Sequence, residues 1–268
     1  MSRTIEDILK LFPDTTAPDW TQHTNGGGWV QSTAHAEEST VIEGMVFGNA
    51  QVSGNAWVSG DAQVYGNAQV SGDAQVYGNA QVFGDAWVSS GAQVYGNAWV
   101  FGDARVYGNA RVYGDAWVSS GAQVSGDAWV SGDAQVSGNA QVSGDARVSG
   151  KARVYGNARV YGDAQVSGDA QVSGNARVSD DAWVSGNAQV SGNAWVSGDA
   201  WETSPLCIQG SAHCATNVKH GYIAIGCEVH TYAEWLKNYK AIGAKAGYSK
   251  EQIKEYEAII DLFVKIGR

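Results

Sequence analysis

Cysteine and histidine are concentrated in one short stretch near the end of the chain. All three cysteines of the 268-residue sequence, and three of its five histidines, fall between residues 207 and 230. Cys227 and His230 have the C-x-x-H spacing of a zinc-ligand pair, and His213 would approach them across a hairpin. A zinc site, a Cys–His catalytic pair and a purely structural set of side chains are the three interpretations. We adopt the structural one, with no cofactor, because paired C-x-x-C and H-x-x-H spacings are absent.

The residues around this cluster predict a small α+β module over residues 202–268. Ile208 and the alternation in GYIAIG predict two strands joined through residues 217–221. Thr231 with Glu234, and Ser249 with Gln252, have the spacing of capping boxes. They predict helices over about 232–246 and 250–266. The predicted order is therefore ββαα, and the module would cap whatever precedes it.

The segment before the module is a strict six-residue repeat. A valine recurs every six residues from Val46 to Val196, in 26 units without an insertion, of which 22 have the form V-[SYF]-G-[ND]-A-[QWR]. A period of six fits neither an amphipathic helix nor a coiled coil. Alanine and valine two positions apart share one side of an extended segment, and Gly followed by Asn or Asp suits a tight corner. Each unit is predicted to be a short strand with Val and Ala inward, and stacked units form a solenoid.

This pattern resembles the hexapeptide-repeat family, whose three hexads per coil wind a left-handed triangular β-helix. The resemblance implies an all-β solenoid, a left-handed parallel β-helix over residues 29–201 that is regular from about residue 44. Valines 18 apart would stack on one of three faces: the first begins at Val46, the second at Val52 and the third at Val58. At about 4.8 Å per coil, the regular hexads make a prism roughly 42 Å long.

Residues 1–28 are predicted to form an N-terminal helix and a glycine-rich entry loop. Thr4 and Asp7 would cap a helix over residues 4–12, which Pro13 ends. Because the terminal coil of a solenoid exposes its core and unpaired backbone, we expect this segment to cover the open end or to form a subunit contact.

Aromatic side chains are expected to point outward in columns. Tryptophan precedes valine in seven units, and serine follows the valine in six of them. This indicates that bulky groups on neighbouring coils exclude one another. Members of the resembled family are typically homotrimers, and the aromatic side chains exceed what a monomer normally exposes. The predicted trimer interface on the first face is Phe47, Tyr65, Phe83, Trp99, Phe101 and Trp117.

Arginine and tyrosine flank the same valine in several units. A guanidinium can pair with a phosphate while a phenol ring stacks on a base, which predicts a small-molecule site. Cross-strand pairing on the surface, or a subunit contact, accounts for the same residues without a ligand. The candidates are Arg105, Tyr107, Arg111, Tyr113, Arg153, Tyr155, Arg159 and Tyr161.

Composition argues against several classes of function. The chain has a net charge of −10, and residues 46–200 hold 13 Asp against 6 Arg and 1 Lys, so a nucleic-acid duplex is not an expected partner. No apolar run is long enough to span a membrane, and the N-terminus is too short and acidic for a signal peptide. A hexapeptide acyltransferase needs a general-base histidine, and residues 46–200 contain none, so the solenoid is not expected to be catalytic.

The runs IQGSAH, IAIGCEVHTYAEW and GYSKEQIKEY, within residues 205–266, resemble an uncharacterised module common in bacteriophage and prophage proteins. The resemblance implies a phage source and a location in the bacterial cytoplasm or the virion. We therefore expect a non-catalytic, trimeric β-helix that serves as a rigid scaffold or virion-associated element. The alternatives are a protein that sequesters a ligand, such as a host signalling nucleotide, between subunits or near the C-terminal module, and a hexapeptide acyltransferase.

Overall fold

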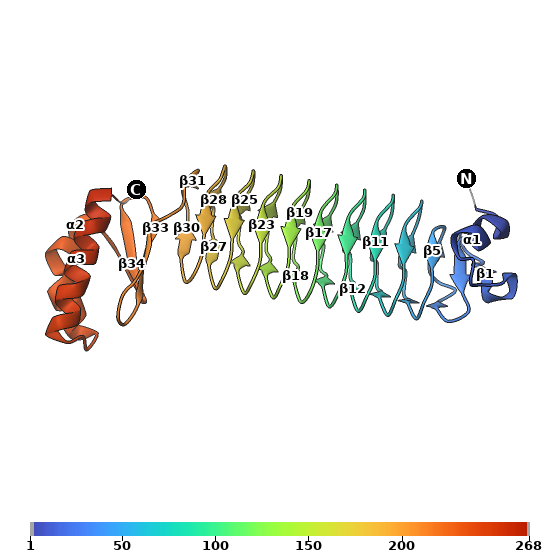
Figure 1. Ribbon diagram of the computed structural model, residues 1–268, viewed down its shortest axis with the longest axis horizontal. Helices are drawn as coiled ribbons and strands as arrows, with labels where there is room; N and C mark the ends of the chain where they lie inside the picture. The colour runs from blue at the N-terminus through green and yellow to red at the C-terminus, as the bar shows by residue number, and fades with distance from the viewer. Residues whose placement is uncertain (1–2, 267–268) are drawn as a thin grey trace.

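The computed structural model describes residues 3–266 and shows a long shaft with a small structure at each end (Figure 1). Helix α1 (Ile5–Leu11) and a 3-10 turn (Ala17–Asp19) lie at one end, and helices α2 (Tyr232–Lys245) and α3 (Lys250–Ile266) lie at the other. Among the described residues, no helix has the length and apolar character that a bilayer span requires. The chain forms a parallel β-solenoid of about ten turns with a small α+β region at its C-terminal end, as predicted.

Three sheets make the three faces of the shaft. β1 pairs with β2 in antiparallel fashion, and each later strand on a face comes from the next coil and is parallel to the one before it. The first face contains β1 (Trp20–Gln22), β2 (Trp29–Gln31), β5 (Met45–Val46), β8 (Gln63–Val64), β11 (Gln81–Val82), β14 (Trp99–Val100), β17 (Trp117–Val118), β20 (Gln135–Val136), β23 (Arg153–Val154), β26 (Gln171–Val172) and β29 (Gln189–Val190). The second contains β3 (His35–Ala36), β6 (Gln51–Val52), β9 (Gln69–Val70), β12 (Trp87–Val88), β15 (Arg105–Val106), β18 (Gln123–Val124), β21 (Gln141–Val142), β24 (Arg159–Val160), β27 (Arg177–Ser179) and β30 (Trp195–Ser197). The third contains β4 (Val41–Ile42), β7 (Trp57–Val58), β10 (Gln75–Val76), β13 (Gln93–Val94), β16 (Arg111–Val112), β19 (Trp129–Val130), β22 (Arg147–Val148), β25 (Gln165–Val166), β28 (Trp183–Val184) and β31 (Ala200–Trp201).

Backbone hydrogen bonds join each coil to the next. The amide of Gln51 donates to the carbonyl of Ala68 at 2.9 Å, and that of Ser53 donates to Val70 at 3.0 Å; the same pattern continues along the shaft. Strands pair with residues 18 apart side by side, as Val82 with Val100. The repeating valines and alanines are completely buried and form one continuous core. The sequence pattern of inward Val and Ala is therefore confirmed.

The corners explain the glycine of the repeat. Gly66 has φ of 71°, and a side chain there would lie 2.9 Å from the amide nitrogen of Gly84 on the next coil. Glycine thus supplies both the left-handed backbone and the close approach between coils. Where the repeat reads SSGA or SDDA, Ser90, Ser120 and Asp180 adopt the same left-handed conformation, with φ between 54° and 60°. These departures therefore keep the corner conformation of the regular units.

Outward side chains contact the coil before them, sixteen residues earlier. The indole of Trp183 donates to the Ser167 hydroxyl at 2.9 Å, and that of Trp195 donates to Ser179 at 3.1 Å. Where the earlier residue is aromatic, the rings meet edge to face, as Trp99 does with Phe83 at 6.1 Å. Bulky groups on neighbouring coils therefore contact one another here, and the exclusion expected from the sequence is not general.

The N-terminal segment covers the open end of the first face. Thr4 caps α1 in a capping box with Asp7, as predicted. Ile8, Trp20, Trp29 and Met45 form a buried cluster beneath the helix. The indole of Trp29 donates to the carbonyl of Arg3 at 2.8 Å, which ties the beginning of the described chain to the first coil. The segment acts as a lid in this structure.

A tryptophan closes the other end of the core. The last strand, β31, is displaced by one residue, so that Trp201 pairs with Val184 rather than with Trp183. Its side chain is 1 % exposed and belongs to the core of the shaft. The wide indole therefore occupies the inward position that valine fills in the preceding coils, and His220 packs edge-on against it at 4.8 Å.

The C-terminal module has four antiparallel strands, whereas the sequence predicted two. They are β32 (Cys207–Gln209), β33 (Cys214–Lys219), β34 (Tyr222–Ile225) and β35 (Glu228–Thr231). The two predicted strands, at Ile208 and in GYIAIG, are β32 and β34. The prediction missed β33, part of which it assigned to the connection 217–221, and β35, because its EVHT sequence lacks an apolar alternation. Both helices and both capping boxes are present where they were expected. The sheet separates the last coil from α2 and α3 (Figure 1).

The corner between the second and third faces yields a prediction. Strand pairing stacks Asp127, Asp145, Asp163 and Asp181 on consecutive coils, whereas Asn109 donates to Asp127 at 3.0 Å. Asp163→Asn replaces a carboxylate between two others with an amide donor. We expect the variant to gain about 0.5–1 kcal/mol at low salt, and less at high salt, in thermal unfolding.

The control for this variant is Asp73→Asn. Asp73 accepts from Asn55 at 3.0 Å, and Gly91 follows it on the next coil, so no like charge is relieved. An equal salt dependence of unfolding in Asp163→Asn and the unmodified chain would contradict the expected repulsion.

Candidate functional site

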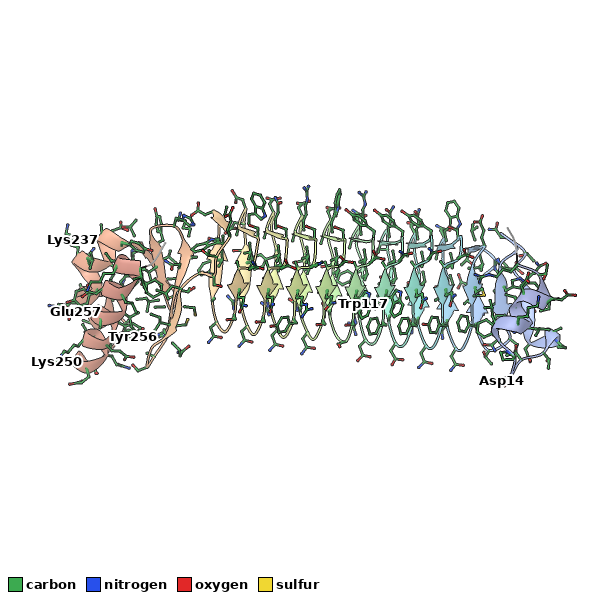
Figure 2. The ribbon with its side chains drawn as sticks, turned by 45° about the horizontal axis from the view of Figure 1, so that its top comes forward. Asp14, Trp117, Lys237, Lys250, Tyr256 and Glu257 are labelled. Carbon is green, nitrogen blue, oxygen red and sulfur yellow. The ribbon has the colours of Figure 1, made fainter. Side chains whose placement is uncertain are left out.

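A pocket of about 200 Å³ lies within the C-terminal module, between its sheet and its helix pair. We call it the C-terminal pocket. Its apolar wall comes from α2 and α3, and its mouth is formed by the beginning of β33, the turn between β34 and β35, and the loop between α2 and α3. In Figure 2, Tyr256 lies on the side of α3 toward the sheet, whereas Lys237 and Lys250 lie on the outer side of the helix pair. The wall includes Trp235, Tyr239, Ile242, Ile253, Tyr256 and Ile260, and the mouth includes His213, Cys227, Glu228, Lys245 and Tyr248.

His213 is held at the mouth by two tyrosines. Its ring nitrogen Nδ1 lies 2.5 Å from the Tyr248 hydroxyl. The Tyr256 oxygen accepts from the amide of His213 at 2.6 Å and from that of Ala212 at 3.2 Å, and its hydroxyl donates to the His213 carbonyl at 2.9 Å. The backbone and the ring of His213 are therefore positioned separately, the first by Tyr256 and the second by Tyr248.

Close packing explains the two glycines beside this histidine. A side chain at Gly210 would lie 2.6 Å from the Tyr256 hydroxyl oxygen, and one at Gly226 would lie 3.1 Å from the His213 ring. Between them, Ser211 donates from its amide and its hydroxyl to the two carboxylate oxygens of Glu255, at 2.8 and 2.5 Å. The GSAH and EQIKEY motifs of the sequence thus pack directly on each other.

Burial dominates the electrostatics of the pocket. It raises the pKa of Tyr248 to about 12, and the neighbouring Tyr256, Cys227 and Glu255 add to the effect. Tyr248 is therefore a neutral phenol at physiological pH, and its hydroxyl shares a hydrogen bond with His213 Nδ1. Which of the two atoms donates depends on the imidazole tautomer. The site can offer an imidazole ring and an aromatic wall to a small ligand.

The structure brings together two of the three predicted module residues. Cys227 is exposed in the turn between β34 and β35 and shares the C-terminal pocket with His213. His230 lies elsewhere: its Nε2 is 3.0 Å from a Glu228 carboxylate oxygen, and its ring packs edge-on against Trp235 at 5.1 Å. Within residues 3–266, no three His, Cys, Asp or Glu side chains are grouped to hold a metal ion.

The predicted aromatic ladder is present on the first face. Phe47, Tyr65, Phe83 and Phe101 stack in parallel with ring centroids 4.8 to 5.0 Å apart. Trp99 and Trp117 form a second stack beside it at 5.2 Å, and Trp117 lies at the middle of the shaft in Figure 2. Phe12 of the N-terminal segment packs against Phe47 at 4.9 Å, so this first ring of the ladder is covered by its own chain.

The eight arginine and tyrosine candidates do not form one site. They are distributed over all three faces: Arg153 is on the first, Arg105 and Arg159 are on the second but three coils apart, and Arg111 is on the third. Arg105 and Tyr107 line a surface hollow of about 500 Å³ with Trp87. The Arg105 guanidinium carbon lies 5.9 Å from the centroid of the Trp87 ring.

Arg111 belongs to a different arrangement on the third face. Its guanidinium and that of Arg147 each lie against the Trp129 ring, 5.2 and 5.1 Å from its centroid. Sequence reasoning missed Trp87, Trp129 and Arg147 as partners of the predicted arginines. The signal was available, because a tryptophan stands 18 residues from each arginine it contacts. Tyr248 and Tyr256 stand in the GYSKEQIKEY run, but nothing in that run indicates their contact with His213.

Removal of one hydroxyl tests how His213 is positioned. Tyr256→Phe removes the acceptor of the Ala212 and His213 amides, a hydroxyl on a side chain that is 3 % exposed. We expect a loss of about 1–3 kcal/mol in the free energy of unfolding and faster amide hydrogen exchange in residues 210–214. Tyr222→Phe, at a ring that lies beside Lys219, is the control and should change neither. Unaltered exchange in Tyr256→Phe would contradict the assignment.

The raised pKa of Tyr248 predicts a pH dependence. The unfolded chain releases this proton near the ordinary tyrosine pKa of about 10, whereas the folded chain keeps it until about 12. The stability that the neutral phenol contributes is therefore complete below pH 10 and lost between pH 10 and 12. Urea unfolding across this window should show a steeper loss for the unmodified chain than for Tyr248→Phe. Parallel curves would overturn the prediction.

Comparison with known proteins agrees with the architecture of the shaft. A family model described as the YdcK beta-solenoid repeat matches residues 50–66, 74–90, 104–120, 122–138, 140–154, 152–168, 170–186 and 188–203. The matching repeat is thus described by a family other than the one the sequence pattern resembles, and the match does not reach the C-terminal pocket. No curated protein and no solved structure matches the chain. The matched segments between residues 50 and 203 are thus repeats of the YdcK β-solenoid type.

Proposed function

We propose that the chain is a non-catalytic scaffold, a rigid shaft that associates with copies of itself and presents the C-terminal module at one end. The observation that carries the proposal is the unbroken core. From Ile42 to Trp201, the interior of the shaft holds repeating valine and alanine and is completely buried. Such an interior leaves no room for a cofactor or a reacting group. Backbone hydrogen bonds between all neighbouring coils make the shaft resistant to bending.

The outward faces support the self-association part of this proposal. The ladder of Tyr65, Phe83 and Phe101 on the first face, with the tryptophan stack beside it, is a flat apolar strip that follows the long axis. Trp117 is 43 % exposed, which is high for so large an apolar side chain. We take the assembly to be a homotrimer, by the resemblance of the repeat to the hexapeptide family. The resemblance of the module to phage proteins supports a role in a bacteriophage particle or in its infected host.

A second candidate function is the sequestration of a small anionic aromatic ligand, and the hollow on the second face favours it. Trp87 offers an indole surface there, and Arg105 offers a guanidinium, while Ser71, Ser89 and Gln123 supply polar groups. This combination suits a nucleotide, whose base stacks on an aromatic ring while its phosphate pairs with arginine. The hollow is open on one side, so a second subunit would be needed to enclose such a ligand.

Native mass spectrometry of the purified full chain tests both candidates. We expect a trimer, and we expect Phe83→Glu with Phe101→Glu to dissociate it because charges would be buried in the contact. Tyr77→Glu with Tyr95→Glu is the matched control, since these rings stack at 4.8 Å on the third face and should leave the trimer intact. A monomeric unmodified chain would contradict the proposal. A trimer with an additional nucleotide mass that Trp87→Ala abolishes would favour sequestration.

A further inference from the structure

Two cysteines meet where the shaft joins the C-terminal module. Cys207 begins β32, the first strand after the solenoid, and Cys214 begins β33. The antiparallel register places Cys207 opposite Thr216 and Gln209 opposite Cys214. The two cysteines are thus diagonal neighbours on one side of the two-stranded ribbon, and their Sγ atoms lie 2.6 Å apart. Both are free thiols.

The surroundings leave this pair open to solvent on one side. Cys207 packs against the core of the shaft, and both side chains are only partly buried. Cys214 lines a groove of about 340 Å³ between the last coils and the module, together with Arg177, Trp195 and His213. A small oxidant in the groove therefore reaches Cys214, and the Cys207 Sγ atom lies 2.6 Å from the Cys214 Sγ atom. The third cysteine, Cys227, follows the end of β34 and lines the C-terminal pocket.

We propose that Cys207 and Cys214 form a reversible disulfide, a redox modification site that fastens the first two strands of the module to each other. The site takes a hydroperoxide as its oxidant. The proposal is independent of the scaffold function, because it concerns only the junction.

The two thiols have different roles in this reaction. The hydrogen bond with Cys214 lowers the pKa of the Cys207 thiol against the opposing effect of burial, whereas the same bond and burial raise the pKa of Cys214. Since the thiolate is the nucleophile, Cys207 reacts first. Its sulfur attacks one peroxide oxygen, the O–O bond breaks, and the departing oxygen leaves as water or an alcohol after taking a proton.

The first step leaves Cys207 as a sulfenic acid. Its conversion into the disulfide needs no further reactant. The Cys214 sulfur attacks the Cys207 sulfur, the S–S bond forms, and the hydroxyl leaves as water with the Cys214 proton. Two thiols have then lost two electrons, and one peroxide has gained them. The disulfide closes a loop from residue 207 to residue 214 and restricts the unfolded chain, so it stabilises the module. A dithiol reductant restores the starting state.

The test uses the full chain carrying Cys227→Ser, so that the exposed third thiol takes no part. After brief treatment with hydrogen peroxide, the free thiols are alkylated and the protein is digested without reduction. We expect a peptide that links residues 207 and 214, no alkylation at either position, and an unfolding temperature several degrees higher for the module. Treatment with dithiothreitol should reverse all three.

Two single variants serve as controls in this background. Cys207→Ser and Cys214→Ser each retain one thiol and should gain neither the linked peptide nor the rise in unfolding temperature. Three outcomes overturn the proposal: both cysteines alkylated after peroxide, both converted to sulfinic or sulfonic acids, or a disulfide between chains. If Cys227→Ser does not fold, the same peptide mapping on the unmodified chain decides, since a link to Cys227 in place of the 207–214 link is equally a refutation.

Discussion

The structure depends on one constraint, the backbone register that places each residue directly beside the residue 18 positions later. Hydrogen bonds such as those from Gln51 to Ala68 impose it, and nearly every other feature of the shaft follows. Because each side chain lies beside its own counterpart, valine stacks on valine inside and a corner glycine approaches the next corner glycine. Outside, the same rule produces a favourable aromatic ladder from Phe47 to Phe101 and an unfavourable column of carboxylates from Asp127 to Asp181.

The rule must fail at the two ends, since the first and last coils have a neighbour on one side only. At the beginning, Ile8 and Trp20 of the lid bury the exposed end of the first face. At the end, a displacement of one residue brings Trp201 into the valine position and lets the chain leave the shaft. The cysteine pair and the pocket both lie beyond Trp201 in the chain. The cysteine pair lies at the junction, and the pocket around His213 lies behind the sheet.

The repeat could be predicted from the sequence because every unit has the same residue types at its inward positions. Within one unit, Val and Ala two positions apart determine which side of the strand faces inward, and the corner glycine determines the turn. The fold then stacks copies of this unit. The helices of the module were readable for a similar reason, since Thr231 with Glu234 marks a helix beginning within four residues. Contacts between distant segments were not readable. The Tyr248–His213 bond and the Tyr256 hydroxyl under Gly210 join residues about 35 to 46 positions apart. The separation of His230 from His213 likewise depends on which side of β35 faces Trp235.

The three-sided cross-section also has a consequence for the length of the shaft. Each hexad advances the chain by one face, so the number of hexads determines the face on which the chain leaves the last coil as well as the distance it has travelled. Gain or loss of three hexads would change the spacing between lid and module by about 4.8 Å and keep their relative orientation. Gain or loss of one hexad would turn the module by about a third of a revolution relative to the lid. The length of the shaft and the rotation of the module about its long axis are thus coupled. Duplications within the repeat keep the orientation of the module relative to the lid when they add multiples of 18 residues.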